Sequence, residues 1–311
     1  MIPDDMQRPS GRRADLGVGL VALLLLAGNT LVWCSALFLL ALLKLLLPVA
    51  RLRAPIDHAL NWVATQWISG NCAWMRLTQR TRWDVDGTPT LSPRRWYLVT
   101  CNHQSWVDIF VLQRVFNRRI PLLKFFLKQE LFYVPVMGLA WWALDFPFMK
   151  RRSTRGRADV ETGRRACERF ARVPTSVMNF VEGTRMTPGK RARQRSPYRH
   201  LLKPKTGALA ASLESLGGKF AAALDVTIVY PGGVPSFWDF LRGRIPEIVV
   251  RYREVALPAG VAGGPASPGE TRDRLAAWVS GVWASKDALI EDILAPAALP
   301  RGQGPVTSAS R

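Results

Sequence analysis

The longest stretch without a charged residue runs from Leu16 to Leu43. It exceeds the roughly 20 residues that an α-helix needs to cross a bilayer. Gly28-Asn29-Thr30 in its middle favours a break, so the pattern fits two arrangements equally: one tilted spanning helix, or two short helices that form a re-entrant hairpin. The run is too long for a cleaved signal peptide and lacks a small-residue cleavage site. We therefore predict a retained membrane anchor behind an N-terminal tail, residues 1–15, on the cytoplasmic or periplasmic side.

Tryptophan recurs in the segment that follows the apolar run, at Trp62, Trp67 and Trp74. This residue is enriched at membrane–water interfaces, although packing in a protein core explains the three almost as well. We assign residues 16–80 to the membrane anchor and an interfacial helix. His58, which lies in the same segment, is expected to be a surface or packing residue rather than a catalytic one.

Short apolar runs alternate with amphipathic segments beyond residue 80. The runs predict strands at Trp83–Val85, Trp96–Cys101, Leu122–Phe126, Phe146–Met149, Ser176–Val181, Val226–Tyr230 and Ile248–Tyr252. The amphipathic segments predict helices at Trp106–Phe116, Ala158–Ala171, Thr206–Leu216 and Arg272–Ile293. Such alternation predicts an α/β fold, with a mixed, largely parallel sheet flanked by helices. We expect one domain at residues 81–295 and a disordered tail at 296–311, because the tail is rich in Ala, Pro, Gly and Ser.

The charge of the chain narrows the class of partner. Lys and Arg number 43 against 23 Asp and Glu, for a formal net charge of +20. Such an excess favours nucleic acid or an acidic lipid surface. The anchor favours lipid and no nucleic-acid recognition motif is present, so we predict anionic membrane lipids, and no nucleic acid, as partners. Lys44, Arg51 and Arg53 follow the anchor, and this bias predicts a basic domain on the cytoplasmic face of the cell inner membrane.

The cysteines and histidines favour neither a disulfide framework nor a metal site. The four cysteines are Cys34, Cys72, Cys101 and Cys167, and no two of them have CxxC spacing. The three histidines are scattered and form no HExxH pattern. We therefore expect a reducing compartment and no metal.

A candidate acid–base pair follows the predicted strand Trp96–Cys101. Ser105-Trp-Val-Asp108 has capping-box spacing, which places His103 in a strand-to-helix turn. With this turn between them, Asp108 can fold back onto the imidazole, fix its tautomer and stabilise the imidazolium. The ordinary alternative is that Asp108 only caps the helix and His103 is a satisfied loop residue. A nucleophilic pair of Cys101 and His103 is less favoured, because Cys101 has the pattern of buried packing, and Ser105 fits a cap better than a nucleophile.

Basic residues and a glycine turn follow other predicted strands. The strand Ser176–Val181 runs into Glu182-Gly183-Thr184-Arg185. Glycine permits a tight turn with exposed amides, and Arg185 offers a two-pronged donor for phosphate. Glu182 suits such a site only if it accepts a hydrogen bond from a hydroxyl beside the phosphate. The basic tract from Lys190 to Lys205 is expected to meet lipid headgroups.

Taken in order, these motifs resemble the 1-acyl-sn-glycerol-3-phosphate acyltransferase (PlsC-like) family. The shared motifs are Asn102-His103-(x4)-Asp108, Lys128-x-Glu-Leu, Phe-Met-Lys150-Arg151, Phe-Val-Glu182-Gly-Thr-Arg185 and Val229-Tyr-Pro231. Three longer strings are most similar to its YihG-like bacterial branch: Cys-Asn-His-x-Ser-Trp-x-Asp, Leu-Asp145-x-Pro-Phe-Met-Lys-Arg and Asn-Phe-Val-Glu-Gly-x-Arg. The resemblance covers residues 16–294. It departs from the family where Met149-Lys150-Arg151 replaces Ile-Asp-Arg and in the fifth motif, which keeps only its proline.

The resemblance implies an acyltransferase fold and a membrane-bound enzyme. By it, His103 deprotonates a glycerol hydroxyl, which attacks an acyl thioester directly without an acyl-enzyme, while Asp108 orients His103. It places the acceptor's glycerol and phosphate at Glu182, Gly183, Thr184 and Arg185, with Lys128, Lys150 and Arg151 nearby. The donor is acyl-CoA or acyl carrier protein, and no cofactor is implied. The favoured acceptor is 1-acyl-sn-glycerol-3-phosphate, with another lysophospholipid or an aminoacyl lipid left open.

Two other classes of function fit less well. A non-catalytic basic membrane scaffold explains the charge and the anchor, but gives no reason for the His103–Asp108 pair beside Glu182 and Arg185. A hydrolase would need a nucleophile elbow, and no G-x-S-x-G pattern is present.

Overall fold

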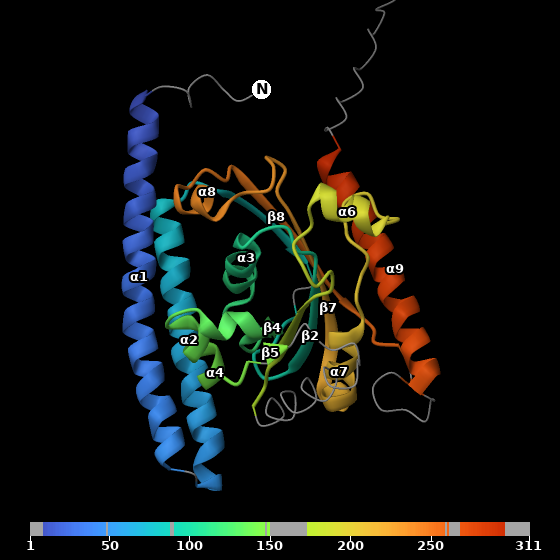
Figure 1. Cartoon of the computed structure of the whole chain (residues 1–311), viewed down its shortest axis with the longest axis horizontal. Coiled ribbons are helices and arrows are strands. Elements are labelled where there is room, and N and C mark those ends of the chain that lie inside the picture. The colour runs from blue at the N-terminus through green and yellow to red at the C-terminus, as the bar shows by residue number, and fades with distance from the viewer. Residues whose placement is uncertain are drawn as a thin grey trace, which may run out of the picture.

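Two long helices run side by side along one edge of the molecule (Figure 1). The structure is a computed structural model that describes residues 9–47, 49–87, 90–146, 148–149, 173–258, 260 and 268–295. Helix α1 spans Pro9–Leu46 and helix α2 spans Ala50–Thr78. Helix α1 thus takes in part of the predicted N-terminal tail. The predicted tail at 296–311 lies outside the described residues.

Helix α1 is continuous through Gly28-Asn29-Thr30, so the predicted alternative of a break there is wrong. The amide Nδ2 of Asn29 donates to Trp67 O at 2.8 Å and to Asn71 Oδ1 at 2.9 Å, and Trp67 Nε1 donates to Thr30 Oγ1 at 3.0 Å. Gly70 makes room for this contact, because a Cβ there would lie 2.1 Å from Asn29 Oδ1. The polar residues therefore join α1 to α2, and the hairpin forms between these two helices rather than within residues 16–43.

Leucines project outward along α1, whereas the polar contacts to α2 occupy its inner side. Leu24, Leu31 and Leu39 are among the exposed apolar side chains. Within the described chain, one helical stretch, Asp15–Leu46, is long and apolar enough to cross a membrane. Exposure of these apolar side chains to water is unfavourable, so the outward face of the helix is suited to contact with lipid.

The centre of the domain is a six-stranded sheet in the order β1-β8-β7-β2-β6-β3. Its strands are β1 (Arg82–Gly87), β2 (Trp96–Cys101), β3 (Leu123–Phe125), β6 (Ser176–Phe180), β7 (Phe220–Val229) and β8 (Glu247–Val255). Only the β7–β8 pair is antiparallel among the neighbours in this sheet. A separate parallel pair joins β4 (Leu127–Lys128) to β5 (Phe148–Met149). The prediction of a mixed, largely parallel sheet is confirmed.

Helices cover both faces of this sheet. They are α3 (Val107–Phe116), α4 (Met137–Ala143), α6 (Pro188–Gln194), α7 (Gly207–Leu216), α8 (Phe237–Leu241) and α9 (Pro268–Leu294), with the 3-10 turns η2 (Gln129–Tyr133) and η3 (Gly217–Lys219). Alternate residues of β2 point to opposite faces. Tyr97 and Val99 therefore join the core with the hairpin and α3, whereas Leu98 joins the core with α7 and α9.

Helix α9 is held to the sheet by a buried lysine. Lys286 pairs with Asp225 Oδ1 at 2.7 Å and donates to Thr227 Oγ1 at 3.1 Å and to the carbonyl of Val226. A buried charge is tolerated only when it is paired and hydrogen-bonded in this way. The lysine thereby attaches α9 to β7, the strand that leads to Tyr230.

Several element predictions differ from the structure. The predicted strand at Val226–Tyr230 is the end of a longer strand that begins at Phe220, and α4, α6 and α8 are short helices that the pattern did not predict. Ala221-Ala222-Ala223 has little intrinsic preference for a strand, but pairing with β2 places it in the sheet. The predicted helix at Ala158–Ala171 lies outside the described residues.

Candidate active site

The candidate site forms where three neighbouring strands end at one edge of the sheet. Cys101 at the end of β2 is in register with Phe180 at the end of β6 and with Val226 of β7. The residues just past β2 and β6 therefore come together, although some 80 positions separate them in sequence. Asn102 joins the third strand, because its side chain donates to Ile228 O at 2.8 Å and accepts from Ile228 N at 2.9 Å.

The structure brings Asp108 into contact with His103. His103 Nδ1 lies 2.8 Å from Asp108 Oδ2, which also accepts hydrogen bonds from Gln104 N at 2.6 Å and Ser105 N at 2.9 Å. The other carboxylate oxygen accepts from the hydroxyl of Tyr230 at 2.7 Å. Because Asp108 is fully buried, these donors offset the cost of holding its charge away from water. The carboxylate directs the Nδ1 proton toward itself and leaves Nε2 as the basic nitrogen.

The imidazole is held on its flat side by an aromatic ring. His103 and Phe180 stack with ring centroids 3.9 Å apart and an interplanar angle of 14°. The His103 side chain is 14% exposed, and no described residue hydrogen-bonds its Nε2 atom. The carbonyl of His103 also accepts from Met186 N at 2.7 Å. The ring is thus fixed in orientation, with one nitrogen free for a substrate.

Asp108 caps the loop as well as contacting the imidazole, so the two interpretations of this residue are combined in one side chain. The predicted capping box is only half formed: Ser105 N donates to Asp108, but Ser105 Oγ accepts from Val107 N at 3.2 Å and donates to Pro235 O at 2.7 Å. Ser105 is therefore engaged on both sides, which agrees with the expectation that it is no nucleophile.

Tyr230 is a site residue that the sequence pattern did not identify. It is buried, lies 122 positions from Asp108, and directs its hydroxyl at the carboxylate. Burial, and then the neighbouring Asp108 charge, raises the pKa of this hydroxyl well above its ordinary value. It therefore remains a donor at neutral pH. The signals available were its place at the end of the strand predicted at Val226–Tyr230 and within the motif Val229-Tyr-Pro231.

Glu182 is a buried residue that connects two segments of the site. It is fully buried, and its oxygens accept from His103 N at 2.9 Å and from Leu202 N at 3.0 Å. Burial raises the pKa of this carboxyl to about 7, against the effect of the two amides. The resemblance implied contact with the acceptor's glycerol. In this conformation the side chain instead joins the His103 turn to the chain before α7, so it is a positioning residue.

Positively charged side chains lie around the turn that follows Glu182. Gly183 has φ +67°, a conformation that favours glycine, and the Lys205 side chain lies over it. Lys190 Nζ donates to Thr184 Oγ1 and to Arg185 O, both at 2.9 Å. The Arg185 guanidinium lies 5.1 Å from the ring centre of Trp106, which follows His103 in the same loop. An anionic group bound near His103 would meet several positive charges here.

Three other predicted site residues are only partly described. Lys128 lies in β4, where its backbone pairs with Met149 of β5. Lys150 and Arg151 directly follow β5 and lie outside the described residues. The pairing of β4 with β5 places Lys128 beside Met149 in the fold.

A thiol nucleophile does not suit this site. Cys101 is fully buried, and its Sγ lies 3.6 Å from Asn102 Oδ1. Burial raises the pKa of the thiol well above its ordinary value, so it stays protonated and unreactive. The alternative of a Cys101–His103 pair is therefore not supported.

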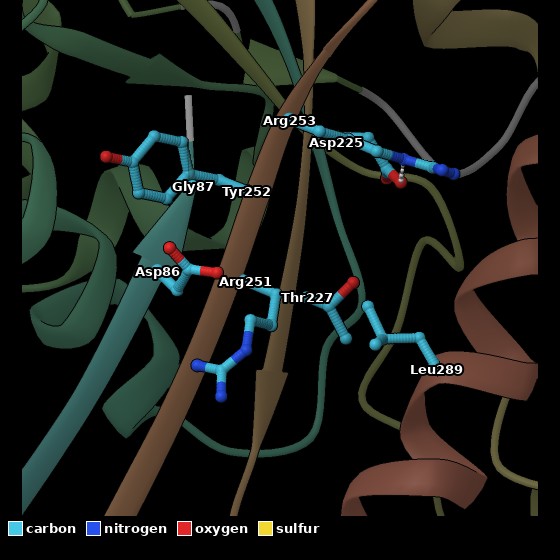
Figure 2. A pocket seen from close by; sticks show the side chains of 8 residues that line it. All are labelled: Asp86, Gly87, Asp225, Thr227, Arg251, Tyr252, Arg253 and Leu289. Atoms are coloured by element: carbon cyan, nitrogen blue, oxygen red, sulfur yellow. Dashed lines mark ion pairs between the residues drawn. The ribbon is translucent and has the colours of Figure 1, made fainter. Parts of the chain in front are cut away.

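A small hollow of about 150 Å³ lies elsewhere on the sheet (Figure 2). Its lining residues are Asp86, Gly87, Asp225, Thr227, Arg251, Tyr252, Arg253 and Leu289, from β1, β7, β8 and α9. Its two arginines are already paired: Arg251 Nη2 lies 2.8 Å from Asp84 Oδ2, and Arg253 Nε lies 3.4 Å from Asp225 Oδ2. The hollow includes none of the residues around His103 and offers no free cation for an anionic ligand.

Comparisons with known proteins agree with this geometry. The acyltransferase family model matches residues 82–231. The chain is 26% identical over 230 residues to 1-acyl-sn-glycerol-3-phosphate acyltransferase gamma from Homo sapiens, covering 70% of this chain and 58% of that protein. It is 24% identical over 216 residues to 1-acyl-sn-glycerol-3-phosphate acyltransferase 2 from Brassica oleracea, covering 65% of this chain and 53% of that protein. The chain thus spans somewhat over half the length of these curated relatives.

A solved structure shares the fold. The crystal structure of the 1-acyl-sn-glycerophosphate (LPA) acyltransferase, PlsC, from Thermotoga maritima matches with a TM-score of 0.50 at 15% identity, covering 90% of this chain and 98% of that one. The YihG-like branch stays a prediction, since no comparison distinguishes it. The acyltransferase domain match and the similar relatives support the predicted resemblance to the 1-acyl-sn-glycerol-3-phosphate acyltransferase (PlsC-like) family, and the solved structure shows that the fold is shared.

Proposed function

We propose that this protein is a membrane-bound acyltransferase that moves a fatty acyl group from a thioester to the free hydroxyl of a lysophospholipid. The favoured acceptor is 1-acyl-sn-glycerol-3-phosphate and the product phosphatidic acid, in phospholipid biosynthesis. The observation that carries the proposal is the His103–Asp108 contact of 2.8 Å, with Nε2 free and a cationic turn beside it.

The chemistry follows from the free imidazole nitrogen. His103 Nε2 takes the proton of the acceptor hydroxyl as its oxygen attacks the thioester carbonyl carbon. Asp108 stabilises the imidazolium that forms. When the carbon–sulfur bond breaks, the imidazolium returns the proton to the thiolate. An ester and a free thiol result, the imidazole is regenerated, and no acyl-enzyme is needed.

Positive charge beside the imidazole supports a phosphate-bearing acceptor. Arg185 is exposed and can make two parallel hydrogen bonds to a phosphate. Lys190 and Lys205 lie against the same turn. We assign the acceptor's phosphate to this turn, with Lys128, Lys150 and Arg151 as further contacts that rest on the family resemblance. Holding the acceptor here brings its hydroxyl toward Nε2, and positioning of this kind can supply much of the rate enhancement.

The membrane location is proposed from the hairpin and the charge. Arg51 and Arg53, just past α1, are exposed, whereas Lys44 is paired with Asp57 at 2.8 Å and Asp145 at 2.9 Å. The net charge of +20 attracts the catalytic domain to anionic lipids. We therefore infer an inner-membrane protein whose domain lies on the cytoplasmic face.

The test is an assay of the purified full-length protein with several acceptors and both donors. Lysophosphatidate, other lysophospholipids and monoacylglycerol are each offered with acyl-CoA and with acyl carrier protein, and products are identified by mass spectrometry. We expect phosphatidic acid, and its loss in folded His103→Ala. Product formed at the wild-type rate by that variant would refute the assigned base. Turnover only with another acceptor would refute lysophosphatidate as the substrate.

A further inference from the structure

An uncharged segment between β4 and β5 exposes several large apolar side chains. No charged residue occurs from Leu131 to Leu144, in a chain whose net charge is +20. Within it, Tyr133 is 77% exposed, Leu139 52% and Trp142 51%. Phe132 and Val134 are also exposed. We call these five residues the α4 patch.

The α4 patch is a built surface rather than an unfolded loop. Val136 has φ +64°, a costly conformation for a β-branched residue, and a Cβ on Gly138 would lie 1.8 Å from Phe132 O. Phe132 packs edge-on against Phe148 of β5, with ring centroids 5.6 Å apart. These constraints direct Tyr133 outward. In α4 the small residues face inward, while Leu139 and Trp142, three positions apart, share the outer face.

The patch continues the apolar surface of the membrane hairpin. Helix α4 packs against α1 (Figure 1). Lys44 near the end of α1 pairs at 2.9 Å with Asp145, two residues past α4. Around Lys44, the side chains of Leu39, Leu45 and Leu46 are exposed. The exposed residues of α4 therefore adjoin those on the C-terminal part of α1.

We propose that the α4 patch enters the lipid bilayer and gives the catalytic domain a membrane contact of its own beside α1. Tyrosine and tryptophan are the residues that favour the membrane–water interface, because each combines an apolar ring with a polar group. A neighbouring helix long enough to cross a membrane favours lipid over a protein as the occupant. The inference rests on the proposed function only for the membrane location of the hairpin, and it does not depend on acyl transfer.

Site-specific photocrosslinking in lipid tests this inference. p-Benzoylphenylalanine replaces Tyr133 or Leu139 in the full-length protein, which is reconstituted into vesicles of phosphatidylethanolamine and phosphatidylglycerol. Leu294 is the matched control, since it is exposed and is the last residue of α9, a helix that lies on the side of the domain away from α1 (Figure 1). We expect lipid adducts at Tyr133 and Leu139 by mass spectrometry, and their absence at Leu294.

A second measurement removes the influence of the apolar crosslinker. Tyr133→Cys and Leu294→Cys are exposed to a membrane-impermeant maleimide added to both sides of the same vesicles, and labelled peptides are quantified. Only Tyr133→Cys should be protected. Equal labelling of the two positions, absence of lipid adducts at Tyr133 and Leu139, or crosslinks to a second copy of the chain would each overturn the inference. Acyl transfer is measured in parallel, so failure of the proposed function would be seen separately.

Discussion

Replacing Asp108 by asparagine separates the two roles of this side chain. Its Oδ2 atom accepts N–H groups from His103, Gln104 and Ser105, and its Oδ1 atom accepts from Tyr230. The amide oxygen of asparagine can take the place of Oδ2, and its NH₂ group then faces a hydroxyl that can rotate and accept. The loop is therefore expected to persist in Asp108→Asn, while the negative charge beside the imidazole is lost.

The structure sets the expected magnitudes. General acid–base catalysis contributes a rate enhancement of about 100- to 10,000-fold. Without the charge of Asp108 we expect kcat to fall by a factor of about that size. The acceptor KM should change little, since Asp108 is fully buried. Asp108→Ala instead leaves the amides of Gln104 and Ser105 without their acceptor. A buried N–H left unpaired costs about 1–3 kcal/mol, out of a typical stability of about 5–15 kcal/mol. The Ser105 amide is buried and should cost about this much, whereas the Gln104 amide is only partly buried and should cost less.

Steady-state kinetics and thermal unfolding in one detergent measure these effects. Asp239→Asn is the matched control, because Asp239 accepts from Ser236 N at 3.1 Å in a similar cap on α8 without a histidine partner. It should leave kcat unchanged. A wild-type kcat with a raised acceptor KM in Asp108→Asn would make Asp108 a binding residue. A loss of stability in Asp108→Asn equal to that of Asp108→Ala would mean that it only caps the helix.

Three further predictions concern the surroundings of this pair. Arg185→Lys should raise the KM for lysophosphatidate by about tenfold, because one of two charged hydrogen bonds to phosphate is lost. If the variant kept the wild-type preference for lysophosphatidate over monoacylglycerol in the same kinetic assay, the phosphate contact would be refuted. In a double-mutant cycle of unfolding free energies, Lys44→Met and Asp145→Asn should show a coupling of about 0.5–3 kcal/mol, since the two charged groups lie 2.9 Å apart. Additive effects would mean that this ion pair does not link α1 to the segment before β5. Burial raises the pKa of Glu182 from 4.5 to about 7, so its contribution to stability is full below pH 4.5 and is lost as pH rises through 7. The stability advantage of the wild type over Glu182→Gln should therefore narrow across this range in pH-dependent melts, and a constant difference would contradict the raised pKa.

The local sequence pattern was sufficient to predict the elements that are apolar along their whole length. The apolar run at Leu16–Leu43 predicted helical structure, as one long helix or two short ones, and the buried strand at Trp96–Cys101 was predicted with its observed bounds. The turn between His103 and Asp108 followed from sequence too, since a strand end and a helix start stand only a few residues apart. These are local features, for which periodicity and capping preference act within a few residues.

Long-range pairing decided the remainder. Asn29 and Thr30 look like a helix break until α2 supplies their hydrogen-bond partners, and Phe220–Ala223 becomes strand because β2 pairs with it. Tyr230 reaches Asp108 only because β7 lies beside β2. Glu182 presents the same case: its motif predicts a substrate ligand, but the fold turns its carboxylate inward onto two backbone amides. The sequence specifies which polar groups need hydrogen-bond partners, because a buried polar group without a partner is costly. The register of the sheet determines which residues become those partners.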